Sequence, residues 1–434
     1  MKPQDTQPRI LIFAAKLGYQ TRAFDAAAKK LDVELVFETD RCRLLDDPWH
    51  DLALPVHFEA PEEAAYAVMR SQEGRRVDAV LALGDRPTLA AAYAARGLAM
   101  LHSHPASIEA CRSKLRMREA FRDAGLPVPW FRSVMLNAIP EPSLLGISYP
   151  CVLKPFSLSA SQGVVRANTP QEFLAGARRL KHVLESAEIQ ATRELNLDRM
   201  LVEGYLPGRE VAVEGLLTEG QLRVLAIFDK PDPLEGPFFE ETIYVTPSRM
   251  SEAEQGTVKK CFADAVRALG LVHGPVHGEF RINEEGAWPI EVASRPIGGL
   301  CARALQFRMT GQNETIGLEE LLLRHALGLP GSDAVREEMA SGVLMIPVPA
   351  SGTLERVERV EEARKVRGVT GLEITARLHD YIAAWPEGSS YLGFLFAKSD
   401  GPEEVEAALR EAHGKLRFEI APRLPVEHPV TKKM

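Results

Sequence analysis

Glu279 and Glu291 lie in the segment HGEFRINEEGAWPIEVASR (277–295), whose residue pattern is typical of a β-hairpin. Apolar and polar residues alternate on both sides of the NEEG turn, and Glu279 and Glu291 each lie six residues from position 285. If the turn is centred there, the two side chains face each other with Cβ atoms about 4.5–5.5 Å apart, where like charges repel. Magnesium, which prefers hard oxygen ligands, would remove that repulsion. A solvated strand face with ordinary ion pairs would give the same pattern.

The strand periodicity brings further side chains to the face of these glutamates. A period of two places His277, Arg281, Ala293 and Arg295 there. Two inward-facing carboxylates beside an arginine favour a cation bound between them. His277 would contact a substrate or help to deprotonate an amine, unless it is a satisfied structural histidine.

Two lysines stand where a phosphate could bind. Lys154 ends the apolar segment YPCVLK, and the loop SLSASQG (157–163) after it offers hydroxyls and backbone N–H groups. Lys114 begins a helix that we expect Ser113 to cap, so a phosphate there would meet an ammonium and a helix dipole. The loop is not a Walker A motif, and either lysine alone could simply extend to solvent.

The segment EGYLPGREVAVEG (203–215) places Glu203 at the end of an apolar strand and Glu210 just after a Pro-Gly turn. The backbone of such a strand end can pair with an adenine ring, and a nearby glutamate can accept hydrogen bonds from ribose hydroxyls. A simple hairpin with solvated acids is the alternative.

A longer segment, 229–248, is rich in proline, phenylalanine and acidic residues. It is either a substrate-facing loop, with Glu240 or Glu241 near an ammonium group, or a plain surface excursion.

Strands alternate with helices through the first hundred residues, which predicts a parallel, Rossmann-like sheet. The expected strands are 9–15, 33–39 and 77–84, and the expected helices are 21–32, 61–74 and 86–97. The fingerprint G-x-G-x-x-G does not follow the first strand, so we do not expect a dinucleotide site. Residues 111–330 mix strands with helices, and 341–434 are β-rich with a last helix at 401–414. The predicted fold class is α/β in the first unit and α+β beyond it.

The order of these features along the chain resembles the ATP-grasp superfamily. The matching features are Lys114, Lys154 with SASQG, E-x-x-L at 203–206, G-x-E at 208–210, Glu279, and E-x-x-x-R at 291–295. GPVHGEFRI and PIEVASRPIGG look especially like the L-amino-acid ligase branch, which makes dipeptides and related amides. ASGTLERV and SSYLGFLFAKS resemble the C-terminal domain of those ligases. The resemblance implies an N-terminal Rossmann-like domain (1–110), an ATP-grasp domain (111–330) and a C-terminal domain (341–434).

The resemblance also implies how ATP would bind. Lys114 and Lys154 would hold the phosphates. The loop 159–163 would close over them, and its expected contacts are Ser159, Ser161 and Gly163. Adenine would meet the backbone of Tyr205 and Leu206, with Glu203 at its exocyclic amine and Glu210 on the ribose.

The remaining roles concern metal and substrate. Glu279 and Glu291 would bind Mg²⁺, or Mn²⁺ in its place, and Arg295, together with Lys154, would stabilise the transferred phosphoryl group. The expected substrate contacts are His277, Glu241, Gly298 and Gly299. Many ATP-grasp enzymes carry an asparagine two residues after the second metal glutamate, where this chain has Ala293. A second magnesium would therefore rely on the two glutamates, phosphates and water.

Composition narrows the class of protein. The net charge of −8 gives no basic footprint for nucleic acid, and no run of 18 apolar residues would span a membrane. The first residues lack the apolar core of a signal peptide, and the five cysteines are scattered, so we expect a cytoplasmic protein. The apolar helices of the first domain would serve either a core or a homodimer interface.

These features predict an ATP-dependent carboxylate–amine ligase that forms ADP and an acyl phosphate and joins small molecules, in particular amino acids. One alternative is a ligase for a phosphorylated amine, like phosphoribosylamine–glycine ligase. Another is a nucleotide-binding module without turnover.

Overall fold

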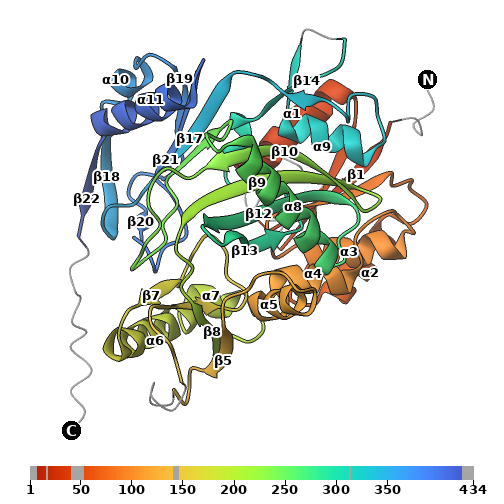
Figure 1. The fold of residues 1–434 in the computed structure, drawn as a ribbon. Helices are drawn as coiled ribbons and strands as arrows, with labels where there is room; N and C mark the ends of the chain where they lie inside the picture. The colour runs from red at the N-terminus through yellow and green to blue at the C-terminus, as the bar shows by residue number, and fades with distance from the viewer. Residues whose placement is uncertain (1–6, 16–17, 41–52, 140–145, 312–313, 423–434) are drawn as a thin grey trace.

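The computed structural model describes residues 7–15, 18–40, 53–139, 146–311 and 314–422 (Figure 1). The chain begins with a parallel four-stranded sheet in the order β3-β2-β1-β4. Its strands are β1 (Arg9–Ala14), β2 (Glu34–Thr39), β3 (Ala53–Pro55) and β4 (Ala79–Leu83). The intervening helices are α1 (Tyr19–Leu31), α2 (Pro61–Ser71) and α3 (Thr88–Gly97). The predicted alternation of strands and helices is confirmed.

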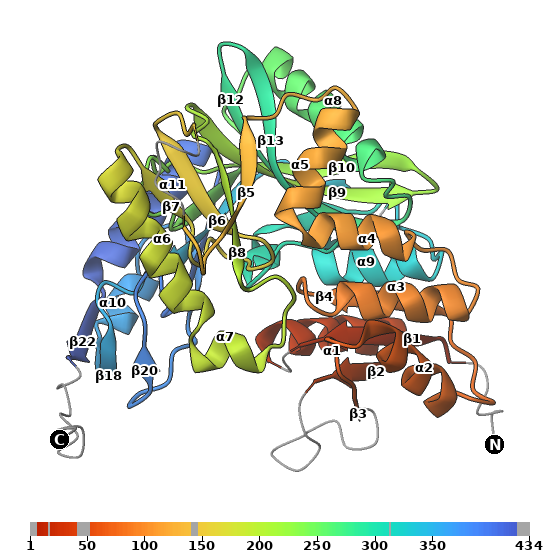
Figure 2. The same cartoon turned by 90° about the horizontal axis from the view of Figure 1, so that it is seen from below.

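A second sheet, antiparallel and of four strands, follows in the order β5-β8-β6-β7. The chain reaches it through α4 (Pro105–Arg112) and α5 (Lys114–Asp123), and Ser113 caps α5 as expected. The strands are β5 (Phe131–Met135), β6 (Cys151–Pro155), β7 (Val165–Ala167) and β8 (Arg199–Gly204). Helix α6 (Pro170–Leu184) covers this sheet, and α7 (Ala187–Ala191) follows at its end (Figure 2).

The largest sheet has eight strands in the order β13-β12-β9-β10-β11-β17-β21-β19. Its first five strands in chain order are β9 (Arg209–Thr218), β10 (Gln221–Asp229), β11 (Ile243–Thr246), β12 (Gly274–Asn283) and β13 (Gly286–Ala293). The last three are β17 (Ala340–Ile346), β19 (Val369–Ile374) and β21 (Gly393–Ser399). Helix α8 (Glu252–Ala268), which starts at the expected Ser251–Glu254 capping box, packs on one part, and α11 (Pro402–Lys415) packs on another. Because strands from 111–330 and from 341–434 share this sheet, the division between those units stays a prediction.

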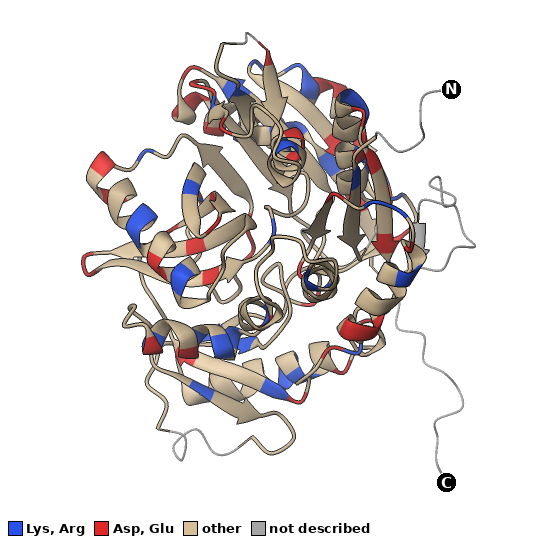
Figure 3. Cartoon of the chain, turned by 90° about the vertical axis from the view of Figure 1, so that its right-hand side faces the viewer, with Lys and Arg blue, Asp and Glu red and all other residues tan. Residues whose placement is uncertain are grey.

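Smaller elements complete the described chain. After β13 come η3 (Cys301–Ala304), β14 (Gln306–Arg308), β15 (Thr315–Gly317), α9 (Leu318–Ala326) and β16 (Val335–Arg336). The C-terminal region adds β18 (Gly352–Glu358), α10 (Val360–Arg364), β20 (Tyr381–Ile382) and β22 (Arg417–Ala421). Within the described residues, no helix is long and apolar enough to cross a membrane. Basic and acidic residues are interspersed along the elements drawn in Figure 3.

The chain passes from β8 in the small sheet to β9 in the large sheet, so these strands do not form the hairpin that was the alternative for 203–215. Gly208, with φ of 119°, makes the crossing, and a Cβ there would lie 2.2 Å from the carbonyl oxygen of Ile282. Only glycine fits this position without strain. Glu203 and Glu210 consequently lie at the junction of two sheets rather than on a solvated hairpin.

Candidate active site

Glu279 on β12 and Glu291 on β13 are direct partners across the hairpin, as the sequence predicts. Asn283 pairs with Gly286, so the turn is centred between Glu284 and Glu285, half a residue before the expected centre at position 285. A β-bulge corrects the difference: Phe280 pairs with Pro289 and Glu279 with Glu291, so Ile290 is the extra residue. A regular hairpin on this turn would pair Glu279 with Ile290 and send Glu291 to the opposite face.

Each glutamate of this pair has an ammonium group beside it. The Nζ of Lys114 lies 3.5 Å from Oε2 of Glu291, and the Nζ of Lys230 lies 3.3 Å from Oε1 of Glu279. Burial opposes ionisation of Glu279, but Lys230 and His277 hold its pKa well below the usual range. The repulsion expected between the two carboxylates is therefore offset by lysines from other elements.

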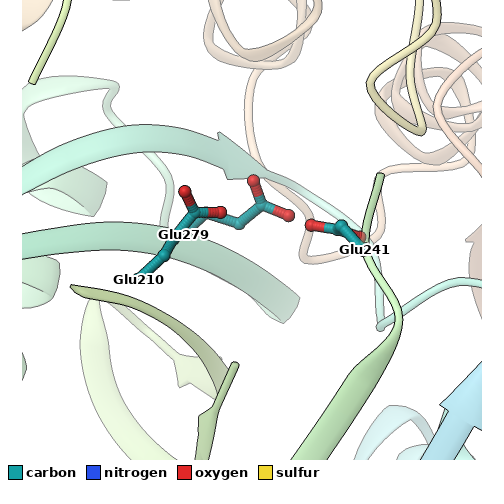
Figure 4. Close-up of side chains that lie close together, drawn as sticks. All are labelled: Glu210, Glu241 and Glu279. Atoms are coloured by element: carbon teal, nitrogen blue, oxygen red, sulfur yellow. The ribbon is translucent and has the colours of Figure 1, made fainter. Parts of the chain in front are cut away.

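Lys230 is buried at the centre of three half-buried glutamates, Glu210, Glu241 and Glu279. Figure 4 shows the three carboxylates close together. One oxygen from each carboxylate lies within 4.8 Å of the others, a spacing that would suit a metal ion. The ammonium of Lys230 contacts all three, at 2.8 Å from Glu210 and directly against Glu241. Burial raises the pKa of Glu241 to about 7 despite Lys230, and the Tyr244 hydroxyl donates to it at 2.7 Å. The cluster thus already contains one cation, the ammonium of Lys230.

Sequence reasoning missed Lys230, although the signal was present. Lys230 is followed by Pro231 at the end of the apolar strand β10, and Lys154 is followed by Pro155 at the end of β6. A lysine that ends an apolar strand is unusual wherever it occurs, because its charge must find a partner.

His277 connects two carboxylates. Its Nδ1 is hydrogen-bonded to Glu214 on β9, and its Nε2 lies 3.6 Å from Glu279. Burial disfavours the charged imidazole, but Glu214 outweighs it and raises the pKa of His277 to about 9. The other oxygen of Glu214 accepts a hydrogen bond from the backbone N–H of Ile297 at 3.1 Å. This arrangement favours a structural role for His277 over a role as a base.

Arg295 is bound by an aspartate of the first domain. The guanidinium of Arg295 donates hydrogen bonds to both carboxylate oxygens of Asp85, at 2.9 and 3.0 Å. Asp85 lies just after β4. Gly298 and Gly299 come next in the chain, and Gly299 has φ of 63° with its Cα facing the Phe394 ring. Arg295 therefore lies where the first domain, the hairpin and the C-terminal strand β21 meet.

Lys154 and Glu203 form an ion pair, which Arg118 of α5 joins at 2.9 Å. All three side chains are buried. Burial raises the pKa of the Glu203 carboxyl, but Arg118 and Lys154 outweigh it and lower that pKa to about 2. Sequence reasoning missed Arg118, which lies four residues after Lys114 and hence on the same face of α5. In this arrangement Glu203 orients Lys154.

The connection from β8 to β9 runs beside an apolar cluster. The backbone N–H of Tyr205 donates to the Pro150 carbonyl at 3.1 Å, and the Leu206 carbonyl accepts from Arg281 at 2.7 Å. Arg281 also pairs with Glu210 at 2.9 Å. The side chains packed around Tyr205 are Val152, Val164, Leu234 and Phe239. The arrangement offers an apolar wall beside backbone polar groups, which suits a planar heterocycle.

The loop 159–163, which we call the phosphate loop, follows β6 closely after Lys154. Ala160, Ser161 and Gly163 all have φ between 52° and 73°. The Nζ of Lys114 donates to the Leu158 carbonyl at 2.7 Å, next to the loop. The structure thus brings Lys114, Lys154 and the phosphate loop together, as expected.

Known proteins match the chain in two regions. An ATP-grasp domain family matches residues 147–304, and the family L-amino acid ligase C-terminal domain 2 matches residues 344–421. The crystal structure of an L-amino acid ligase from Bacillus licheniformis superposes with a TM-score of 0.79 and 26% identity, covering 96% of this chain and 99% of that one.

Two curated relatives extend the comparison. The alanine–anticapsin ligase of Bacillus subtilis (strain 168) is 24% identical over 296 residues, which cover 64% of this chain and 62% of the relative. A formate-dependent phosphoribosylglycinamide formyltransferase of Thioalkalivibrio sulfidiphilus is 28% identical over 283 residues, 63% of either chain. The chain spans about three fifths of the length of the curated relatives that it matches.

Proposed function

We propose that this chain, which belongs to the ATP-grasp superfamily and carries an L-amino acid ligase C-terminal domain, uses ATP to join two amino acids through an amide bond. One observation carries the proposal. The opposed carboxylates of Glu279 and Glu291, each with a lysine beside it, lie on a hairpin that ends two residues before Arg295. Such a site neutralises and positions phosphates without a protein nucleophile.

ATP would lie between the two sheets. Its base would stack in the apolar cluster beside Tyr205, which would offer its carbonyl because its N–H is bonded to Pro150. Leu206 would contribute its N–H. Glu210 would give up its contact with Arg281 or Lys230 and would instead accept hydrogen bonds from the ribose hydroxyls. Lys114 and Lys154 would contact the phosphates under the phosphate loop.

Glu279 and Glu291 would hold magnesium. The donors are hard carboxylate oxygens on adjacent strands, which fits the ion. Bound there, magnesium would neutralise charge on the phosphates of ATP. Ala293, buried beside this pair, adds no ligand.

The proposed chemistry has two steps. An oxygen of the substrate carboxylate attacks the γ-phosphorus of ATP, the bond to the bridging oxygen breaks, and ADP leaves. The nitrogen of the second substrate then attacks the carbonyl carbon of the acyl phosphate, loses a proton and displaces inorganic phosphate. Arg295, fixed by Asp85, would stabilise the phosphoryl group in both steps. Lys154, oriented by Glu203, would support the first.

The test is ATP- and magnesium-dependent phosphate release, screened over pairs of amino acids with mass detection of the products. The proposal expects a condensed product that disappears in Glu291→Ala and Arg295→Ala. If ATP is bound but no pair of amino acids turns over, the amino-acid acceptor is wrong. Phosphate release with a phosphorylated amine would then assign the alternative ligase, and no release with either class would leave a nucleotide-binding module.

A further inference from the structure

A short segment of the C-terminal region lies directly against the phosphate loop. We call residues 385–387, which precede β21, the strap. Figure 2 shows β7 and α6, which follow the loop in the chain, beside the C-terminal elements. Three hydrogen bonds join loop and strap: Gly163 N to Pro386 O at 3.1 Å, Trp385 Nε1 to Ala160 O at 3.2 Å, and Gln162 Nε2 to Glu387 O at 2.8 Å.

The loop adopts a backbone conformation that needs support from outside. Ala160 and Ser161 have φ of 55° and 52°, in the left-handed region that residues with a Cβ rarely adopt. Such conformations persist only where the surroundings over-determine them. The strap bonds the carbonyl of Ala160, the first residue of the strained pair, and the N–H of Gly163, two residues after the pair. The contacts with the strap are therefore part of what fixes the loop.

Trp385 is itself held rigidly. Its side chain is 8% exposed, and its ring packs against Tyr391 with centroids 5.0 Å apart. Tyr391 in turn meets Phe394 of β21 edge to face. The indole N–H is thus aimed at Ala160 by the packing of the C-terminal region.

An ion pair extends the contact beyond the loop. Both oxygens of Glu387 bind the guanidinium of Arg179 on α6, at 2.6 and 3.0 Å. Helix α6 follows β7, so the strap holds the loop and also the helix behind it. The two side chains are 43% and 37% exposed, which leaves the pair open to substitution without a buried charge.

We infer that the strap is a positioning element for ATP, through which the C-terminal region fixes the phosphate loop in the conformation that receives the phosphates. The inference rests on the proposed nucleotide site. It predicts that residues outside the ATP-grasp match, 147–304, set the affinity for ATP. Trp385 and Glu387 act through the loop and touch neither phosphate nor substrate.

The first test removes single hydrogen bonds. Trp385→Phe deletes the indole N–H and keeps a smaller aromatic ring, and Gln162→Leu deletes the amide. One hydrogen bond corresponds to roughly fivefold in an equilibrium constant. Each variant should therefore bind ATP about fivefold more weakly in calorimetric titrations without amino acids, with an unchanged melting temperature. In turnover assays KM for ATP should rise, while KM for the amino acids stays the same.

The second test exchanges charges. Arg179→Glu and Glu387→Arg should each weaken ATP binding about two- to fivefold, the range of an exposed ion pair. The double exchange should restore it. Arg303 and Glu373 offer a matched control, because they also pair across to the C-terminal region and are 44% and 35% exposed. The same exchange there should leave ATP affinity unchanged.

Two outcomes would overturn the inference in different ways. If the wild-type protein binds ATP and all strap variants fold and bind it within twofold of wild type, the strap has no positioning role. If the wild-type protein binds no ATP, the proposed function and the inference both fall.

Discussion

Asp85 binds the guanidinium of Arg295 with both carboxylate oxygens, although 210 residues separate them in the chain. The contact joins the segment after β4 to the segment after the hairpin of β12 and β13. A bidentate carboxylate fixes the plane of a guanidinium as well as its position. The first domain therefore decides where the positive charge of Arg295 points.

Asp85→Asn should lower kcat about 10- to 100-fold, because one charged acceptor is lost and Arg295 can turn away from the phosphoryl group. KM for ATP should change little, since Asp85 pairs with Arg295, whose proposed partner is the transferred phosphoryl group. Steady-state kinetics with wild type and variant measure the split. Asp85→Glu, which keeps the charge, should recover part of kcat; equal rises in every KM with kcat intact would contradict a positioning role.

Glu291→Gln should raise the magnesium concentration needed for half-maximal activity and lower turnover, because a neutral amide is a poorer ligand than a carboxylate. The same hairpin supplies its own control. Glu284 and Glu285 lie exposed in the turn, so Glu285→Gln should behave as wild type. Magnesium titrations of phosphate release compare the two. Identical magnesium curves for Glu291→Gln and Glu285→Gln would remove Glu291 from the metal site.

Glu38 on β2 should make stability depend on pH. The side chain is fully buried, both of its oxygens lack a hydrogen-bond partner among the described residues, and burial raises its pKa from 4.5 to about 8. The folded protein holds this proton more tightly than the unfolded chain, so stability falls as pH rises from about 4.5 to 8 and levels off above.

Glu38→Gln should remove this dependence of stability on pH. The variant should therefore melt at a higher temperature than wild type at pH 8.5 and at nearly the same temperature at pH 5. Glu34→Gln, on the same strand but paired with Arg9, is the control and should show no such gain. A Glu38→Gln difference that is equal at both pH values would show that the wild-type carboxyl is not held neutral.

The sequence carries the local part of the site. Strand periodicity predicts that Glu279 and Glu291 face each other, and the structure pairs them. The bulge at Ile290 makes this pairing possible, but the alternation of apolar and polar residues does not predict it. The turn lies half a residue from the expected centre, and the bulge shifts the register back by the same amount. The local pattern therefore predicts the correct pair of residues, although it does not predict the bulge that makes their pairing possible.

The partners of the site residues could not be read from the sequence. Asp85, Arg118 and Lys230 each reach the site from a different element, and which charge meets which depends on how the sheets and helices pack. The boundary expected near 341 stays a prediction, since β17 there continues a sheet that also contains β9. The periodicity of a segment predicts which of its faces is exposed, but it does not predict which other element packs against that segment.

Lys230→Met should destabilise the protein, because it leaves Glu210, Glu241 and Glu279 close together without their shared cation. Removing one partner from a buried ion cluster costs about 3–5 kcal/mol. Magnesium should then raise the melting temperature of the variant more than that of wild type, since a divalent ion can take the place of the ammonium. Thermal melting with and without magnesium measures both effects. Lys260→Met, which removes an exposed lysine paired with Asp264, should change neither, and a Lys230→Met protein as stable as wild type would mean that the three carboxylates are held apart without that cation.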